Sequence, residues 1–352
     1  MIIDSQKVNE IYKHLSDEES KSLFSKRLAY SLVPSYENMR ALVRHDNPVL
    51  LDTLQSFVDR GDKVCVYGIG NDYWYTGRVI CHLFFDHFGG AYDKNASALG
   101  EVKFGSTRFI VQEPEKIKEV ASNSVFIIGT PNPIFQREMY NNLLNFGIPA
   151  KKIIFLPPTY DYGWNNYFDR PFLTYGENEV LVDCGCYDGE TSISFANLMN
   201  GRATKIIAYE PNGVQIAECE ENLVEIPYAI VKNLGVWDKR ETLRFSADGM
   251  MARINNSGDI TINTVSLDED LKDERVTFIK MDIEGAELKA LQGAEKLILA
   301  NRPKLAICVY HKPEDIIEIP EFIVNLGLGY RLYLRHQYLA SNETVLFAVP
   351  TL

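Results

Sequence analysis

The chain has 352 residues, of which 46% are hydrophobic and 24% charged, as in ordinary soluble globular proteins. Its formal net charge of −12 argues against a general nucleic-acid binder, because such proteins present a basic face to phosphates. No hydrophobic run is long enough for a signal-peptide core or a membrane span, and the 6 scattered cysteines do not suggest a disulfide framework. We therefore expect a cytoplasmic protein with reduced thiols, built from two domains and an appendage.

Residues 1–60 are predicted to form a helical N-terminal extension. Apolar residues recur there at helical spacing, and Ser16 or Asp17 is placed to cap the segment EESKSLF. We expect this extension to pack on the domain that follows it.

Residues 61–157 are predicted to form a smaller Rossmann-like α/β domain, with strands at Lys63–Tyr67 and Ser124–Gly129. The loop after the first strand has Gly68 and Gly70, but Tyr73 stands where a dinucleotide fingerprint has its third glycine. Asp93 could hold a ribose or could equally be a turn residue. The pattern resembles the nucleotide-sugar-associated N-terminal domains of bacterial polysaccharide enzymes. We favour acceptor recognition or a dimer contact for this domain over nucleotide binding.

Residues 158–178 are predicted to be a linker, because the surrounding segment is rich in proline, glycine and aromatic residues. Trp164, Tyr167 and Phe168 are expected to dock this linker onto the C-terminal half. An aromatic cluster of this kind could also stack on a sugar or on adenine.

The stretch Val180–Ile193, VLVDCGCYDGETSI, contains an apolar strand ending in an acid, a glycine turn and the start of a helix. Asp183 stands where a dinucleotide fingerprint has its first glycine, so the expected ligand carries a cation, as S-adenosylmethionine does, rather than a pyrophosphate. Glycine-rich turns also occur in α/β proteins with nothing bound. The cofactor-binding residues predicted here are Asp183, Gly185, Cys186, Tyr187, Asp188, Gly189 and Thr191.

Two further predicted strands, Lys205–Glu210 and Val276–Asp282, also end in acids. In doubly wound folds a carboxylate after the second strand holds the ribose hydroxyls, and we assign Glu210 to that role. An acid after a strand often only caps the next helix, but recurrence at matched positions argues against this explanation for all three. The cofactor set is completed by Glu210, Pro211, Asn212, Gly235, Val236, Trp237 and Asp282.

The segments Phe278–Glu295, FIKMDIEGAELKALQGAE, and Ile262–Leu271, INTVSLDEDL, closely resemble the FkbM family of S-adenosylmethionine-dependent methyltransferases. The resemblance extends from about Tyr167 to the end of the chain. It implies a class I methyltransferase domain at residues 179–352, with a seven-stranded Rossmann-like sheet whose last strand is antiparallel. It also implies O-methylation of hydroxyls on sugars or polyketides, with Trp237 beside the adenine.

The residues themselves agree with this fold, because three further strands are predicted near the C-terminus. They are Lys304–Tyr310, Tyr330–Arg335 and Thr344–Val349. Together with helical segments between the strands, they predict a βαβ series that finishes in a hairpin.

Methyl transfer from a sulfonium is an in-line displacement, so the protein must align an acceptor oxygen and remove its proton. Asp282, Glu284 and His311 follow predicted strands and are the catalytic candidates. His311 could act as a base with the ordinary imidazole pKa of about 6.5, or it could be a buried histidine that caps a strand. Glu287 is expected to stabilise a helix N-terminus by its charge, and His336 is a weaker acceptor-side candidate.

Mg²⁺ is considered as a second cofactor, because Asp282, Glu284 and Asp268 could supply the oxygen ligands that it prefers. The simpler interpretation of Asp268 is that it caps a helix.

The sequence therefore predicts an S-adenosylmethionine-dependent O-methyltransferase acting on a hydroxyl of a sugar, glycan precursor or related metabolite, in polysaccharide biosynthesis. Two alternatives remain. One is a nucleotide-sugar-modifying oxidoreductase or epimerase that uses the first domain, although neither an intact phosphate loop nor a Tyr/Lys pair is found. The other is a non-catalytic nucleotide-sugar-binding protein. The expected partner is a small-molecule or glycan acceptor, without nucleic acid or a membrane span; a homodimer is also considered.

Overall fold

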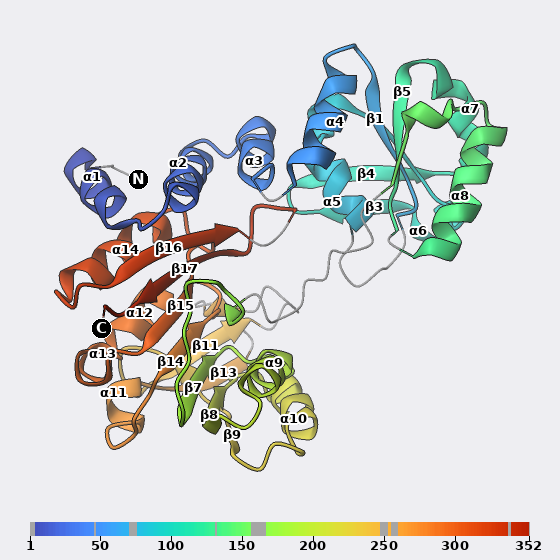
Figure 1. Ribbon diagram of the computed structural model, residues 1–352. Helices are drawn as coiled ribbons and strands as arrows, with labels where there is room; N and C mark the ends of the chain where they lie inside the picture. Colours follow the sequence, from blue (N-terminus) through green and yellow to red (C-terminus); the bar gives the residue numbers. More distant parts are fainter. Residues whose placement is uncertain are drawn as a thin grey trace. The chain divides into compact units, whose positions relative to one another are not determined.

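The computed structural model describes residues 4–45, 47–69, 76–130, 132–155, 167–246, 253–254, 260–336 and 339–351. The chain forms two compact units. The N-terminal unit consists of Val33–Asp161 with Tyr338–Ser341, and the C-terminal unit consists of Met1–Leu32, Tyr162–Gln337 and Asn342–Leu352. Figure 1 draws both units with their helices and strands labelled.

The N-terminal unit is built on a six-stranded sheet with the order β3-β4-β2-β1-β5-β6. Five of the strands run parallel, and β3 pairs antiparallel with β4. The strands are β1 (Lys63–Tyr67), β2 (Phe88–Tyr92), β3 (Glu101–Phe104), β4 (Thr107–Gln112), β5 (Ser124–Ile128) and β6 (Ile153–Phe155). The predicted first strand and the predicted strand at 124–129 are confirmed, whereas β3, β4 and β6 were not predicted. The Rossmann-like designation of this unit remains a prediction.

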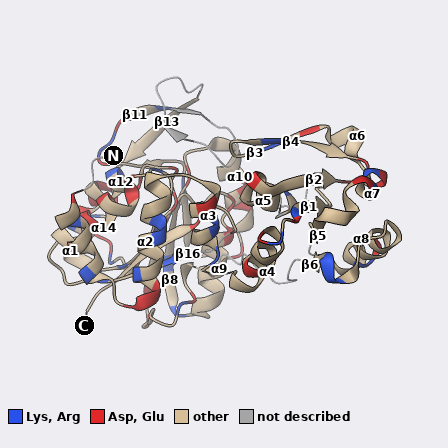
Figure 2. Ribbon diagram, turned by 90° about the horizontal axis from the view of Figure 1, so that it is seen from above, with Lys and Arg blue, Asp and Glu red and all other residues tan. Residues whose placement is uncertain are grey.

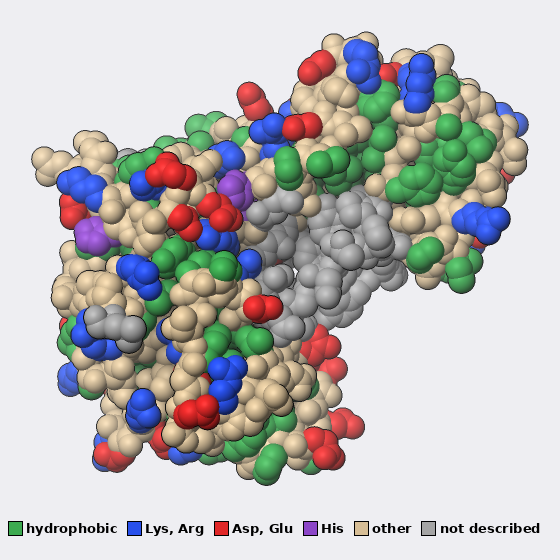
Figure 3. Space-filling view, viewed as in Figure 1, with side chains coloured by type: hydrophobic (Ala, Val, Ile, Leu, Met, Phe, Trp, Pro, Cys, Tyr) green, Lys and Arg blue, Asp and Glu red, His purple; other side chains and the backbone are tan. Residues whose placement is uncertain are grey.

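The helices of this unit are α3 (Tyr36–Val43), α4 (Pro48–Val58), α5 (Thr76–Leu83), α6 (Ala96–Leu99), α7 (Ile117–Val120) and α8 (Pro133–Asn145), with short 3-10 turns η1 (Phe85–His87), η2 (Pro114–Lys116), η3 (Ala121–Asn123) and η4 (Ala150–Lys152). Apolar side chains gather on one face of the unit (Figure 3). Ile134, Phe135 and Leu144 on α8 are among the exposed ones.

The C-terminal unit contains the predicted seven-stranded sheet, with the order β16-β17-β15-β14-β7-β8-β9. All neighbouring pairs are parallel except those of the last strand, β17, which is antiparallel to both β15 and β16. The strands are β7 (Glu179–Cys184), β8 (Ala203–Tyr209), β9 (Ala229–Lys232), β14 (Phe278–Met281), β15 (Lys304–Cys308), β16 (Arg331–His336) and β17 (Thr344–Val349). The expected class I architecture, including the antiparallel last strand, is confirmed.

Apolar residues from the end of the predicted linker complete the core of this sheet. Phe168 is fully buried, with its ring centroid 5.0 Å from that of Phe195 and 5.2 Å from that of Phe278. Tyr167 is buried beside it. The expected docking of Tyr167 and Phe168 on the C-terminal half is therefore confirmed, while Trp164 lies outside the described residues.

A second, four-stranded sheet in this unit was not predicted. Its order is β10-β13-β11-β12, and it consists of β10 (Gly235–Val236), β11 (Thr242–Ser246), β12 (Arg253–Ile254) and β13 (Ile260–Val265). The helices of the unit are α1 (Ser5–His14), α2 (Glu18–Leu32), α9 (Glu190–Met199), α10 (Gly213–Asn222), α11 (Leu267–Asp270), α12 (Glu287–Gln292), α13 (Glu295–Asn301) and α14 (Asp315–Asn325).

The first two helices correct one expectation. We expected the whole N-terminal extension to pack on the domain that follows it, but residues 1–32 belong to the C-terminal unit. The Ser16 amide donates to the Leu332 carbonyl at 2.8 Å, and the Leu334 amide donates to Ser20 Oγ at 2.9 Å. The physical reason is that β16 is an edge strand with unpaired backbone groups, and this segment covers them.

Figure 2 shows acidic and basic residues intermixed along the helices of both units. None of the helices in the described parts of the chain combines the length and the apolar character needed to cross a bilayer.

Candidate functional site

The carboxyl ends of four parallel strands bring the predicted site residues to one edge of the seven-stranded sheet. Asp183 on β7 is in register with Lys280 on β14, and Cys184 is in register with both Met281 and Tyr209. The segments that follow β7, β8, β14 and β15 therefore leave the sheet at the same level, which is where ligands bind in open α/β sheets.

The glycine turn after β7 contacts the ends of both neighbouring strands. The amides of Gly185 and Cys186 donate to the Tyr209 carbonyl at 2.9 and 3.1 Å. Gly185 has φ +77°, and a Cβ placed there would lie 2.0 Å from the carbonyl oxygen of Asp282. Only glycine fits this position, because both the backbone conformation and the approach to Asp282 exclude a side chain.

Asp183 lies beneath the glycine turn with no exposed surface. Its Oδ1 is 3.1 Å from Lys280 Nζ, and its Oδ2 accepts from Ser192 Oγ at 2.8 Å. Lys280 Nζ also donates to the Gly185 carbonyl at 2.8 Å. Burial alone would lower the pKa of Lys280, but the carboxylates of Asp183 and Asp282 raise it above its ordinary value. Asp183 thus fixes the base of the turn, and its contact with a cofactor remains a prediction.

The start of α9 has no side-chain cap. Gly189, in the left-handed conformation with φ +88°, occupies the N-cap position. Ser192 is buried and bonds Asp183 instead, and Thr191 is also buried.

Glu210 follows β8 and is 8% exposed. Its carboxylate accepts from the amide of Tyr187 at 3.2 Å and from the amide of Asn212 at 2.9 Å. Burial raises the pKa of Glu210, although these two hydrogen bonds oppose the shift. The side chain therefore joins the turn after β7 to the turn after β8, and its ribose contact remains a prediction.

The remaining predicted cofactor residues lie around these turns. Cys186, Asn212, Gly235 and Val236 are buried, whereas Tyr187, Asp188, Pro211 and Trp237 are half-buried. Asn212 caps α10 by accepting from the Val214 amide at 3.1 Å.

Asp282, Glu284 and His311 form a cluster whose side-chain ligand atoms all lie within 4.8 Å of one another. His311 Nε2 is 3.4 Å from Asp282 Oδ1 and 3.5 Å from Glu284 Oε2. On the other side of the ring, Nδ1 is 2.9 Å from Oε1 of the fully buried Glu287. The same Glu287 oxygen accepts from the Ile283 amide at 2.8 Å. The structure thus brings the three predicted catalytic residues together and gives Glu287 a role beyond its charge at the start of α12.

These carboxylates change the protonation of the cluster. Burial alone would lower the pKa of His311, but Glu287, Asp282 and Glu284 raise it to about 10. Burial raises the pKa of Glu284 to about 8, and the nearby His311 opposes that shift. Three carboxylates around a nearly buried ring thus favour the imidazolium form of His311, so the pKa is not the ordinary one that we expected, and the role of His311 as a base remains a prediction.

Three residues of this site were not among the predicted functional residues: Tyr167, Tyr310 and Glu343. The Tyr167 hydroxyl lies 3.3 Å from Asp282 Oδ2 and 3.3 Å from Glu343 Oε2. The Tyr310 hydroxyl lies 3.1 Å from Asp282 Oδ1 and 3.2 Å from Glu343 Oε1. Burial, together with the charge of Asp282, raises the pKa of Glu343 to about 7. The signal for Glu343 was its place directly before an antiparallel strand, whose N-terminus lies at the same edge as the carboxyl ends of the parallel strands.

Asp268 does not belong to the cluster, so the predicted oxygen set for Mg²⁺ is wrong in that member. Its carboxylate accepts from the amides of Lys296 and Leu297 at 3.2 and 2.8 Å, and so caps α13. His336 is buried, and its Nδ1 is 2.9 Å from Thr344 Oγ1.

In the N-terminal unit, both carboxylate oxygens of Asp93 bind backbone amides. Oδ2 accepts from Ile69 at 2.8 Å and Oδ1 accepts from Asn95 at 2.9 Å. This supports the interpretation of Asp93 as a turn residue. Gly70 and Tyr73 of the predicted phosphate loop lie outside the described residues.

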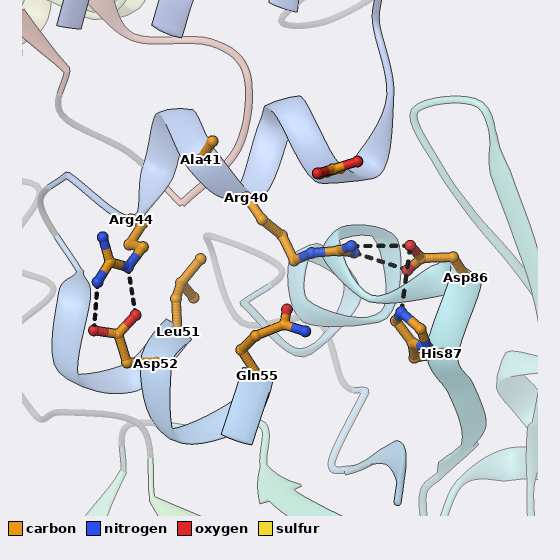
Figure 4. Close-up of a pocket in the computed structure, with 9 residues that line it drawn as sticks. Arg40, Ala41, Arg44, Leu51, Asp52, Gln55, Asp86 and His87 are labelled. Carbon is orange, nitrogen blue, oxygen red and sulfur yellow. Dashed lines mark hydrogen bonds and ion pairs between the residues drawn. The ribbon is translucent and has the colours of Figure 1, made fainter. Parts of the chain in front are cut away.

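A cavity of about 450 Å³ lies beside α3, α4 and η1 in this unit (Figure 4). Arg40 forms a bidentate pair with Asp86 at 2.7 and 2.9 Å, and Arg44 pairs with Asp52. The two arginines and two aspartates that line the cavity therefore neutralise one another.

Comparisons with known proteins point to a family for part of the C-terminal unit. The model of the methyltransferase FkbM domain matches residues 183–332. The crystal structure of the methyltransferase FkbM from Methylobacillus flagellatus KT is similar with a TM-score of 0.55 at 17% identity, covering 94% of this chain and 99% of that chain. At this identity the likeness supports the fold alone.

Two weaker likenesses are Aeropyrum pernix fibrillarin in complex with S-adenosyl-L-methionine (TM-score 0.36, 10% identity, 53% of this chain and 76% of that chain) and a putative methyltransferase from Streptococcus mutans in complex with SAH (TM-score 0.33, 14% identity, 53% and 93%). Their TM-scores are too low to support a conclusion. No curated protein matches the sequence. The family-model match and the seven-stranded sheet together show that the C-terminal unit contains a methyltransferase FkbM domain at residues 183–332.

Proposed function

We propose that the C-terminal unit binds S-adenosylmethionine and transfers its methyl group to a hydroxyl of a sugar, glycan precursor or related metabolite. The observation that carries the proposal is that the Gly185 turn, Glu210 and the Asp282 cluster lie at one edge of the sheet. A cofactor site and a proton-accepting site are needed side by side for this reaction.

The residues present fit the cofactor. Gly185 leaves the top of the turn without a side chain, and the two oxygens of Glu210 each accept one amide, so each keeps a lone pair for a ribose hydroxyl. Tyr187 lies in the turn after β7 and Asn212 in the turn after β8, which are the two turns that Glu210 joins. When bound, the cofactor supplies a methyl group activated by its sulfonium charge.

Asp282 is the residue that we assign to take the proton from the acceptor hydroxyl. We do not assign this role to His311, because the surrounding carboxylates favour its protonated form. Its imidazolium, 3.4 Å from Asp282, instead stabilises the negative charge at the reacting oxygen. With the cofactor bound, its sulfonium would supply the methyl group, and Asp282 would hold the proton that the acceptor hydroxyl loses.

The cluster fits Mg²⁺ poorly in this state. The side chain of His311 lies 3.4 Å from Asp282 and 3.5 Å from Glu284, so an imidazolium there occupies the place beside these two carboxylates that a cation would take. We therefore derive no step through a metal ion, and we expect activity to survive EDTA.

The acceptor is proposed to be uncharged or cationic at its reacting end. The carboxylate of Asp282 would repel a carboxylate or phosphate placed at the hydroxyl. This is compatible with a sugar hydroxyl, the acceptor that the FkbM resemblance implies. We assign acceptor recognition or a homodimer contact to the N-terminal unit.

Calorimetric titration tests the cofactor assignment. We expect the protein to bind S-adenosylmethionine and S-adenosylhomocysteine, and not NAD or UDP-sugars. Glu210→Gln should weaken both adenosyl ligands by about tenfold or more, because it replaces a charged acceptor of ribose hydrogen bonds. Glu220→Gln, on the exposed side of α10, is the matched control and should change neither affinity.

Binding of NAD or a nucleotide-sugar alone would refute the proposal and favour the oxidoreductase or epimerase alternative. If the adenosyl pair binds, transfer of labelled methyl groups to a panel of sugars and nucleotide-sugars, with and without EDTA, identifies the acceptor class. Adenosyl binding without transfer to any hydroxyl would favour the non-catalytic alternative.

A further inference from the structure

We propose that Glu343 is a positioning residue of the methyl-transfer site, which holds the Asp282 carboxylate in place through the hydroxyls of Tyr167 and Tyr310. This inference rests on the proposed function, because it concerns the residue assigned there to take the proton.

The geometry is a closed ring of four side chains. Each tyrosine hydroxyl lies between one oxygen of Asp282 and one oxygen of Glu343, at the four distances of 3.1 to 3.3 Å given above. Both oxygens of Asp282 are held, so the carboxylate cannot rotate without breaking a contact. Asp282 and Glu343 are 61 positions apart in the sequence and meet only because β17 runs antiparallel to β15.

The ring has fewer protons than contacts when both carboxylates are ionised. Each phenol has one proton and can direct it to one carboxylate at a time. The remaining two oxygen–oxygen contacts then lack a proton, so the ring gains a hydrogen bond when a proton is added to a carboxyl group. A proton that Asp282 takes up can therefore form a further hydrogen bond within the ring.

The backbone at Glu343 supports a role beyond packing. Its φ is +63°, a left-handed conformation that is unfavourable for a glutamate outside a helix cap. Two other non-glycine residues of the site share this feature, Tyr187 with φ +51° and Glu284 with φ +56°. Such conformations persist only where the surroundings enforce them, and they are concentrated at functional sites.

The two tyrosines are themselves fixed. Tyr167 is buried in the core below the sheet edge, and the Tyr310 ring lies 4.0 Å from that of His311. Arg27 on α2 donates to the Tyr310 carbonyl at 3.1 Å. The hydroxyls therefore transmit the position of Glu343 to Asp282 with little freedom of their own.

The test compares the affinity for S-adenosylmethionine with that for S-adenosylhomocysteine. Only the first carries the sulfonium charge, so the ratio of affinities reports a carboxylate facing the methyl group. A general loss of structure would lower both affinities equally. We expect Asp282→Asn to reduce this ratio by about tenfold, from Coulomb attraction across a partly buried site.

If Glu343 positions Asp282, then Glu343→Gln should reduce the ratio to a similar extent. The Tyr167→Phe and Tyr310→Phe double variant should do the same although it removes no charge, and adding Glu343→Gln to it should cost nothing further. Glu220→Gln is the control and should leave the ratio unchanged.

Three results overturn the inference while leaving cofactor binding intact. They are an unchanged ratio in Glu343→Gln, equal losses of both affinities in that variant, and an unchanged ratio in Asp282→Asn. Failure of the unaltered protein to bind either ligand is a different result, which overturns the proposed function and this inference with it.

Discussion

Replacement of Gly185 by alanine tests whether the site depends on the contact between the ends of β7 and β14. The added Cβ would lie 2.0 Å from the Asp282 carbonyl oxygen, where ordinary contacts begin at 3.4 Å. Because this oxygen belongs to the backbone, the ends of β7 and β14 must move apart to make room. The left-handed conformation of an alanine costs about 1–2 kcal/mol, and forcing extra volume into a packed site costs about 1–3 kcal/mol. We expect Gly185→Ala to lower the free energy of unfolding of the C-terminal unit by about 2–5 kcal/mol and to abolish adenosyl binding.

Gly201→Ala separates the two contributions. Gly201 has a similar φ of +88°, but a Cβ there would meet nothing within 4 Å. This variant should cost only the conformational part, about 1–2 kcal/mol. Both variants are to be measured by urea titration, with the transition of the C-terminal unit identified by hydrogen exchange of peptides from β7 and β14. Equal losses in the two variants would show that the close approach to Asp282 does not constrain the turn.

Two further predictions concern the buried charges. Lys280→Met leaves Asp183 buried without its cation and should destabilise the unit by about 3–5 kcal/mol in urea titration. The Lys280→Met, Asp183→Asn double variant should recover part of this loss. A loss below about 1 kcal/mol in the single variant would contradict a buried ion pair. The pKa of His311 is raised from 6.5 to about 10, so its contribution to stability is complete below pH 6.5 and is lost as the pH rises through 10. His311→Gln should flatten the decline of stability between pH 7 and 10, and an unchanged slope would mean that His311 is not an imidazolium in the folded state.

The seven-stranded sheet was predictable because most of its strands are short apolar runs, buried on both faces, that are separated by helical segments. The four-stranded sheet was not, because β10 and β12 have two residues each and β13 alternates between exposed and buried positions only in part. A usable signal was overlooked in β4, TRFIVQ, which is rich in the β-branched and aromatic residues that favour strands. The docking of residues 1–32 could not be predicted, since it depends on which strand forms the edge of the sheet.

The catalytic candidates were found by a topological rule, that ligands bind where parallel strands end. The same rule places the beginning of an antiparallel strand at that edge, and this extension of it would have included Glu343. The raised pKa of His311 could not be predicted from the sequence, for a different reason. It depends on Glu287, 24 positions earlier, and on the removal of both side chains from water, neither of which a strand-end pattern contains.

The imidazolium also bears on the chemistry of the acceptor. Four carboxylates, those of Asp282, Glu284, Glu287 and Glu343, lie near the cations His311 and Lys280, and such an excess of carboxylates is stable only if protons neutralise part of it. The raised pKa values of Glu284 and Glu343 correspond to such neutralisation. In the proposed reaction, the cluster would therefore accept the proton of a hydroxyl while keeping its total charge low. An acceptor that brings its own negative charge to the reacting end would disturb this balance, and for that reason we propose a neutral hydroxyl as the substrate.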